Sequence, residues 1–233
     1  MRVAAVGAHP DDVEILCGGT IARLAAEGAE VTLISLTDGA AGSVRIPPAE
    51  LSETRHAEAL RAAALIGAKL EWIGEPDEFL VDTPAVRSAL IVALRRAQPE
   101  LVVTHHPADY HPDHRTASSL AFAASFAATL PMVLPTEPAV GVVPALAYFE
   151  TLGGAGFVPD QYVDISDYFE KKLELFGCHE SQAAWLGEHD VVDMTDVITT
   201  VARFRGYQCG VRYAEAFAWE GAWGRPRASR LLP

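Results

Sequence analysis

Short apolar segments alternate with helix-forming segments along the first half of the chain, and this alternation constrains the fold more than any other feature. The apolar segments predict four strands, at Val3–Ala8, Val31–Thr37, Lys69–Ile73 and Leu101–Thr104. The segments that follow them predict four helices, at Glu14–Glu27, Ser52–Ile66, Thr83 to about Gln98 and Pro112 onward. Strand–helix alternation indicates βαβ units and a largely parallel sheet. The strands are continuously apolar, as expected when helices cover both faces of the sheet. We therefore predict a doubly wound α/β fold.

The pattern becomes less regular after Leu130, where four prolines occur within fourteen residues. Two further strands are expected at Ala145–Thr151 and Gln161–Ile165, and two further helices at Asp167–Gly177 and Val197–Phe204. No segment has the composition of a linker, so we expect one domain, residues 1–233, with an elaborated C-terminal third.

Composition excludes several classes of protein. The chain has 233 residues, of which 50% are hydrophobic, so it can bury enough apolar surface to fold. The formal net charge of −13 argues against a surface for nucleic acid or anionic membranes. The three cysteines form no CxxC motif, so neither a disulfide framework nor a thiolate zinc site is expected, and a reducing cytoplasm is the predicted compartment.

One segment has the length of a membrane span. Residues Thr116–Thr136 carry no charge, but they include serines, threonines and two prolines, and their apolar content is mostly alanine. We interpret this segment as a buried helix. The apolar start of the chain, Val3–Ala8, is too short for the hydrophobic region of a secretory signal, so no targeting segment is expected.

Two polar segments follow predicted strands. Ala8–Glu14 comes after the first strand, and His105–His114, which holds four of the chain's eight histidines, comes after the fourth. In doubly wound sheets, ligands bind beyond the carboxyl ends of the strands where the strand order reverses. With the order 3-2-1-4, the two segments would face each other across one crevice.

These segments combine imidazoles with carboxylates and contain no thiolate, which is the ligand set of a catalytic zinc or a similar divalent ion. His9 and Asp12 are three residues apart, as are His111 and His114. A catalytic zinc takes three protein ligands, so both residues of one pair and one residue of the other pair would be enough to hold it. Asp11 and one histidine would remain for proton transfer and for stabilising developing charge.

At these positions the sequence resembles the PIG-L/LmbE-like family of zinc-dependent N-acetylglucosaminyl deacetylases. The family signature is Ala-His-Pro-Asp-Asp-x-Glu after the first strand with a downstream His-Pro-Asp-His, and both are present, as Ala8–Glu14 and His111–His114. The similarity extends over almost the whole chain, with further matches at Thr37–Gly39, Gly42, Ser43, Arg55, Glu58, Ala59, Pro99, Lys172, His179, Ser181, Gln182 and Tyr213–Phe217. Leu175 stands where the family has alanine.

The resemblance implies a Rossmann-like fold, a zinc ion and specific residue roles. His9, Asp12 and His114 match the metal ligands, and Asp11 matches the general base that acts on the water at the metal. His111 matches the histidine that polarises the carbonyl and assists the leaving amine.

Further positions are candidates with supporting roles. Asp113 matches the carboxylate that orients His111 in the family, and Arg55 matches an arginine that meets substrate. Asp77 follows the third strand and Tyr110 lies in the histidine-rich loop, so both are candidates for substrate binding, with a solvated turn position as the alternative. The roles of His179 and Gln182 stay open. The tryptophans Trp185, Trp219 and Trp223 could line a site for the aglycone, but core packing is the default expectation.

The implied reaction is removal of acetyl from an N-acetylated amino sugar by attack of water at the zinc on the amide. The alternative is a zinc-dependent amidase of a related non-sugar or thiol-conjugate amide. The aglycone, the choice of zinc or ferrous iron, and the oligomer number stay open, although homo-oligomers, often trimers or hexamers, are usual in the family.

Two classes compete with this interpretation. A receiver-type phosphotransfer domain also places an acidic pair after the first strand, but it needs no histidine cluster after the fourth. A non-enzymatic zinc module would need four protein ligands, whereas Asp11 and one histidine are surplus here.

Overall fold

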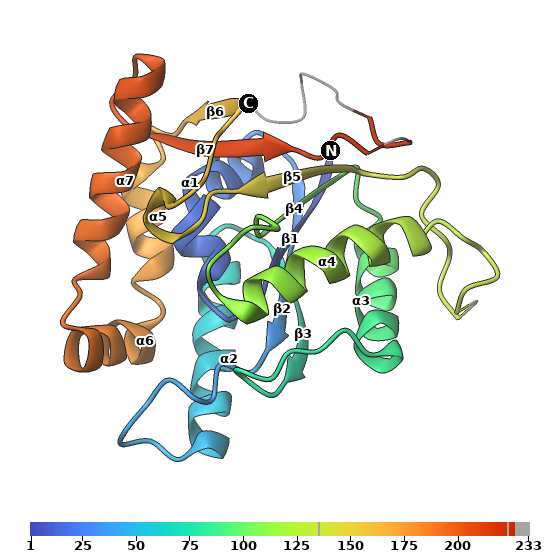
Figure 1. Cartoon of the computed structure of the whole chain (residues 1–233), viewed down its shortest axis with the longest axis horizontal. Coiled ribbons are helices and arrows are strands. Elements are labelled where there is room, and N and C mark those ends of the chain that lie inside the picture. The colour runs from blue at the N-terminus through green and yellow to red at the C-terminus, as the bar shows by residue number, and fades with distance from the viewer. Residues whose placement is uncertain (135, 223, 227–233) are drawn as a thin grey trace.

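A seven-stranded mixed sheet forms the centre of the molecule (Figure 1). The computed structural model describes residues 1–134, 136–222 and 224–226. The strand order is β3-β2-β1-β4-β5-β7-β6, in which neighbouring strands from β3 to β5 are parallel and β7 runs antiparallel to both β5 and β6. The strands are β1 (Arg2–Gly7), β2 (Glu30–Thr37), β3 (Lys69–Glu75), β4 (Leu101–Thr104), β5 (Ala145–Phe149), β6 (Gln161–Asp164) and β7 (Ala214–Trp219). The predicted α/β fold with a mostly parallel sheet and the order 3-2-1-4 is confirmed.

Helices cover both faces of this sheet, as the continuously apolar strands predict. The helices are α1 (Asp12–Ala26), α2 (Pro48–Leu65), α3 (Pro84–Ala97), α4 (Pro112–Ala127), α5 (Phe169–Phe176), α6 (Glu180–Trp185) and α7 (Met194–Cys209). Side chains of α1, α5 and α7 form one core with alternate residues of the strands, and α3 and α4 form a second core with the intervening residues. Because successive strand side chains point to opposite faces, one strand such as β1 supplies Val3 and Ala5 to the first core and Ala4 and Val6 to the second.

Helix ends follow their capping residues. Thr83 Oγ1 accepts a hydrogen bond from Val86 N, with Pro84 in the first turn of α3, as the sequence indicates. Asp193 caps α7 in the same way and starts this helix three residues earlier than expected. The helix α2 also starts earlier, at Pro48 instead of Ser52, because Pro at the first helical position costs no hydrogen bond.

The C-terminal third contains elements that the sequence patterns do not predict. The strand β7 inserts between β5 and β6, and α6 continues into a π-helical turn at Leu186–Asp190. The strand β5 ends at Phe149, two residues before the expected end. Among the described residues, no helix has both the length and the apolarity needed to cross a bilayer, and the uncharged segment from Thr116 lies largely in α4, which packs on the sheet.

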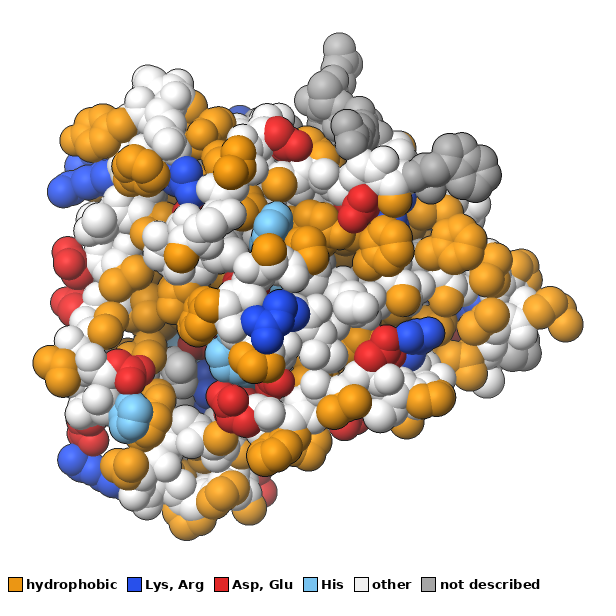
Figure 2. Space-filling model, viewed as in Figure 1, with side chains coloured by type: hydrophobic (Ala, Val, Ile, Leu, Met, Phe, Trp, Pro, Cys, Tyr) orange, Lys and Arg blue, Asp and Glu red, His pale blue; other side chains and the backbone are white. Residues whose placement is uncertain are grey.

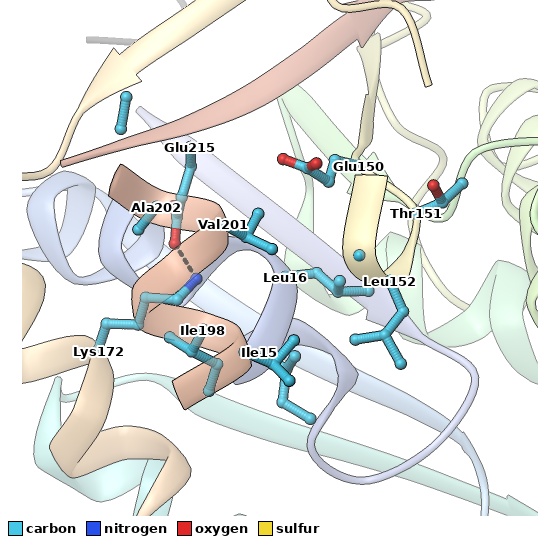
Figure 3. Close-up of a pocket in the computed structure, with 13 residues that line it drawn as sticks. Ile15, Leu16, Glu150, Thr151, Leu152, Lys172, Ile198, Val201, Ala202 and Glu215 are labelled. Atoms are coloured by element: carbon cyan, nitrogen blue, oxygen red, sulfur yellow. Dashed lines mark hydrogen bonds and ion pairs between the residues drawn. The ribbon is translucent and has the colours of Figure 1, made fainter. Parts of the chain in front are cut away.

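A buried ion pair joins this C-terminal third to α1. Lys172 of α5 points toward Glu215 of β7, beside Ile15 and Leu16 of α1 (Figure 3), and both charged side chains are 3% exposed. The backbone of α1 departs from helical angles at Cys17, and the Glu215 carboxylate accepts hydrogen bonds from the amides of Gly19 and Thr20 after this kink. Glu215 therefore caps the second part of the helix that carries the first polar segment.

Candidate active site

The two polar segments meet at the carboxyl ends of β1 and β4. These strands are parallel neighbours, with Val6 paired with Thr104, so the loops that follow them start side by side. Ligand atoms of His9 and Asp12 from the first segment and of His114 from the second lie within 4.8 Å of one another. The structure thus brings together the three side chains that the resemblance marks as metal ligands.

The spacing of these atoms fits a small divalent cation. Asp12 Oδ2 lies 3.4 Å from His9 Nδ1, Asp12 Oδ1 lies 3.4 Å from His114 Nε2, and the two imidazole nitrogens are 3.3 Å apart. Ligands held about 2.1 Å from a tetrahedral zinc ion are separated by about 3.4 Å. The donor set of two imidazoles and one carboxylate therefore fits zinc in both chemistry and size.

The remaining nitrogen of each imidazole faces a carboxylate. His114 Nδ1 lies 3.1 Å from Asp109 Oδ1, and His9 Nε2 lies 3.2 Å from Asp77 Oδ1. Such a carboxylate fixes the orientation of a metal-binding imidazole and increases its basicity. Asp109 also accepts a hydrogen bond from His111 N, so one buried carboxylate positions two histidines of the site.

Crowded carboxylates change the acid–base properties of the ligand histidines. Burial of His114 disfavours its charged form, but the Asp12 and Asp109 carboxylates outweigh this effect and raise its pKa to about 9. The pKa of His9 is raised well above its usual value by Asp12, Asp113 and Asp77, again against the effect of burial. A bound cation would supply the positive charge that protons supply here.

Asp11 occupies a different position from Asp12. Its backbone has φ 144° and ψ −19°, and none of the ligand clusters found among the described residues includes its carboxylate. Arg55 Nη2 lies 3.2 Å from Asp11 Oδ1. Burial raises the pKa of Asp11 to about 6, with Arg55 opposing and Asp12 reinforcing the shift.

His111 lies at the N-cap of α4. Its Nδ1 accepts a hydrogen bond from the backbone amide of Asp113, and its Nε2 lies 3.2 Å from Glu78 Oε1. The Asp113 carboxylate instead accepts from Leu80 N and lies 3.5 Å from His9 Nε2. The backbone amide of Asp113 thus contacts the His111 ring directly, and a carboxylate oxygen of Asp113 lies within 4.8 Å of a nitrogen of this ring. Orientation of the His111 ring by the Asp113 carboxylate stays a prediction.

A cavity of about 290 Å³ opens beside the cluster. The metal-side wall includes the three candidate ligands, Asp11 and His111, and an apolar wall consists of Ile15, Leu16, Leu152, Trp185, Leu186 and Met194. On the face in Figure 2, histidine and acidic side chains lie together at the edge of a hollow beside α4. The three predicted substrate-binding residues, Arg55, Asp77 and Tyr110, all line this cavity.

Sequence reasoning missed part of this lining. Glu78 and the apolar residues of α6 belong to no sequence motif, so the patterns did not indicate them. The family match at Gln182 did point to this helix, and Gln182 lines the cavity. Trp185 lies on the cavity wall, which is the alternative to core packing that the sequence left for it. Trp219 ends β7, and Trp223 lies outside the described residues. His179 is fully buried, and its Nε2 lies 3.4 Å from Glu14 Oε1, away from the cavity lining.

Comparison with known proteins agrees with this geometry. The model of the PIG-L family, described as GlcNAc-PI de-N-acetylase, matches residues 4–125, which include both polar segments. A diacetylchitobiose deacetylase from Thermococcus kodakarensis is 32% identical over 225 residues, covering 92% of this chain and 81% of the relative.

Solved structures show the same fold. The N,N′-diacetylchitobiose deacetylase of Pyrococcus horikoshii superposes with a TM-score of 0.80 at 30% identity, covering 94% of this chain and 83% of the other. The 4-carboxy-2-hydroxymuconate hydratase of Pseudomonas putida superposes with a TM-score of 0.83 at 27% identity, and all of both chains is covered. By sequence and by structure, this chain belongs to the PIG-L family of de-N-acetylases.

Proposed function

We propose that this protein is a zinc-dependent N-deacetylase that removes the acetyl group from an N-acetylated amino sugar of the GlcNAc type. The observation that carries the proposal is the His9–Asp12–His114 cluster, with the Asp11 carboxylate beside it but outside it. A structural zinc site would be closed by a fourth protein ligand, whereas a catalytic site keeps a position open and a base nearby. The deacetylase relatives act on diacetylchitobiose, which supports a GlcNAc-type substrate here.

His9, Asp12 and His114 would hold the metal. When bound, zinc supplies a Lewis acid for the amide carbonyl and lowers the pKa of water at the site. The identity of the metal is part of the proposal, and elemental analysis of the purified protein distinguishes zinc from ferrous iron.

The side chains around the cluster have separate tasks. Asp11, held by Arg55, takes the proton from the attacking water. His111 accepts a hydrogen bond from the Asp113 amide at Nδ1, so its proton lies on Nε2, from which it donates a hydrogen bond to the developing oxyanion. The proton that Asp11 takes from the water passes to the nitrogen of the leaving amine as the C–N bond breaks. Leu16, Leu152 and Leu186 also line the cavity and limit the access of bulk water. Arg55 and Asp77 shape the polar wall through their pairs with Asp11 and His9, and the exposed Tyr110 can contact a substrate.

A hydratase relative has the same fold, so the reaction must be tested directly. The name of that relative's substrate includes a carboxylic acid group. In the described cavity lining, Arg55 is the one Arg or Lys side chain, and it is already paired with Asp11, while Asp77 and Glu78 add negative charge. This distribution of charge favours an uncharged amide over a polycarboxylate.

The test is a panel of substrates incubated with the zinc-loaded protein. It contains N-acetylglucosaminides with different aglycones, a non-sugar N-acetyl amide, a thiol-conjugate amide and 4-carboxy-2-hydroxymuconate. We expect free amine from the glucosaminides. Amine only from the other amides supports the alternative amidase, and consumption of the muconate without amine release contradicts the proposal.

We also propose a homo-oligomer in the cytoplasm. Phe122, Phe126 and Leu130 occur along one side of α4 and its end, with 38%, 53% and 40% of their surfaces exposed. Apolar surface of this kind is typical of contacts between subunits. All three cysteines are free, which supports a reducing compartment. Light scattering in solution tests the oligomer and would show a monomer if the proposal is wrong.

A further inference from the structure

Glu78 has a backbone conformation that its residue type rarely adopts. It follows Asp77 in the turn after β3, and its φ is 66°, in the left-handed region that favours glycine. A residue held in this region is strained, and such strain concentrates at functional sites. A glycine would satisfy the turn without strain, so the side chain of Glu78 needs a separate explanation.

That side chain belongs to the cavity. Glu78 lines it, with 54% of the side chain exposed, and Oε1 lies 3.2 Å from His111 Nε2. The neighbouring Asp77 is different, because its side chain is 8% exposed and its two oxygens are occupied by His9 Nε2 and the amide of Ala41. Among the described residues that line the cavity, Glu78 is therefore the carboxylate outside the metal cluster that a substrate can contact.

The arginines on the surrounding segments do not neutralise Glu78. Arg45 is paired with Glu188, Arg55 with Asp11, and Arg115 donates to the carbonyl oxygens of Asp109 and Tyr110. The contact of Glu78 with His111 is also temporary in the proposed reaction. When His111 Nε2 donates its hydrogen bond to the substrate's carbonyl oxygen, the Glu78 carboxylate can accept a hydrogen bond from a new donor.

We infer that Glu78 determines specificity by charge: the part of the substrate next to the N-acetylglucosamine unit is uncharged or cationic, and anionic aglycones are rejected. This inference rests on the proposed deacetylase function. A hydroxyl or an ammonium group donates to the Glu78 carboxylate, whereas a phosphate or carboxylate at the same position is repelled and cannot donate.

The test compares three N-acetylglucosaminides: a methyl glycoside, a glucosamine-linked disaccharide with a free amine, and GlcNAc-1-phosphate. For the zinc-loaded wild type we expect kcat/KM for the phosphate to be about tenfold or more below that for the methyl glycoside, chiefly through KM. In Glu78→Gln this ratio should fall to about threefold or less, while Glu53→Gln, an equal charge change on an exposed position of α2, should leave it unchanged. High salt should reduce the discrimination of the wild type.

A second variant separates specificity from folding. Glu78→Gly relieves the strain at φ 66°, so its Tm should equal or exceed that of the wild type while the discrimination is lost as in Glu78→Gln. An unchanged ratio in both variants, or a wild type that prefers the phosphate, overturns the inference.

Failure of the proposed function gives a distinct result. If the wild type releases amine from none of the three compounds, the deacetylase proposal is contradicted. Calorimetric binding of the same compounds to wild type and Glu78→Gln then still tests charge selection: weaker binding of the phosphate that recovers in the variant supports it, and equal binding overturns it.

Discussion

Arg55 Nη2 lies 3.2 Å from Asp11 Oδ1, and both side chains are 3% exposed. The same guanidinium donates to the carbonyl oxygens of Gly39 and Pro10, so it joins three segments of the chain. Gly39 has φ 64°, and a Cβ there would lie 2.6 Å from Arg55 Nη1. The close approach therefore requires glycine at position 39, and Arg55 holds Asp11 in place as well as lining the cavity.

Replacing Asp11 by Asn tests its role as the base. The amide keeps the shape of the side chain but cannot take a proton, so turnover should fall by about 10²–10⁴ while the zinc content stays near that of wild type. The loss should appear in kcat more than in KM. Loss of zinc from this variant would instead make Asp11 a ligand, and the roles of Asp11 and Asp12 would be exchanged.

Asp109 should control metal affinity without touching the metal. Because its carboxylate faces His114 Nδ1 at 3.1 Å, Asp109→Asn should weaken zinc binding by about 10- to 100-fold, measured by competition with a chromophoric chelator. Asp82→Asn is the matched control, because it removes an equal charge from a carboxylate that pairs with the exposed Arg87 and does not line the cavity. Equal zinc affinity in Asp109→Asn and wild type would contradict this role.

Much of the fold could be predicted from the sequence because strand and helix periods are local. The first four βα units and the position of the two polar loops follow from apolar segments, Thr83-Pro84 and the strand order. The strand β7 could not be found in this way, since Ala214–Trp219 pairs with β5 and β6 only through long-range contacts. Its place in the middle of the sheet depends on the packing of the whole C-terminal third.

The site shows the same division. The motif residues His9, Asp12 and His114 are near one another in the structure as expected, because each follows a strand end. Glu78 and Trp185 carry no motif, and only the turn after β3 and the placement of α6 bring them to the cavity. The contacts of side chains within a motif also could not be predicted, as the approach of the Asp113 carboxylate to His9 at 3.5 Å shows.

The buried Lys172–Glu215 pair should be important for stability. Lys172→Met leaves an uncompensated carboxylate in the interior, so the free energy of unfolding should fall by about 3–5 kcal/mol in urea denaturation. The neighbouring Lys171 pairs with Glu174 at the surface, and Lys171→Met should cost less than about 1 kcal/mol. Equal, small effects of the two substitutions would show that the buried pair adds little.

The central claim is that a metal held by His9, Asp12 and His114 is needed for amide hydrolysis, and one titration tests it most directly. Amine release from an N-acetylglucosaminide is measured for the zinc-loaded protein, after removal of the metal by a chelator, and after zinc is added back, in parallel with His114→Ala and with circular dichroism as a check on folding. The account predicts that activity disappears with the metal and returns at one equivalent of zinc in wild type, that His114→Ala binds zinc weakly and stays inactive, and that the metal-free chain keeps its secondary structure. Full amine release from the metal-free protein, or zinc binding and turnover in His114→Ala equal to those of wild type, would contradict it.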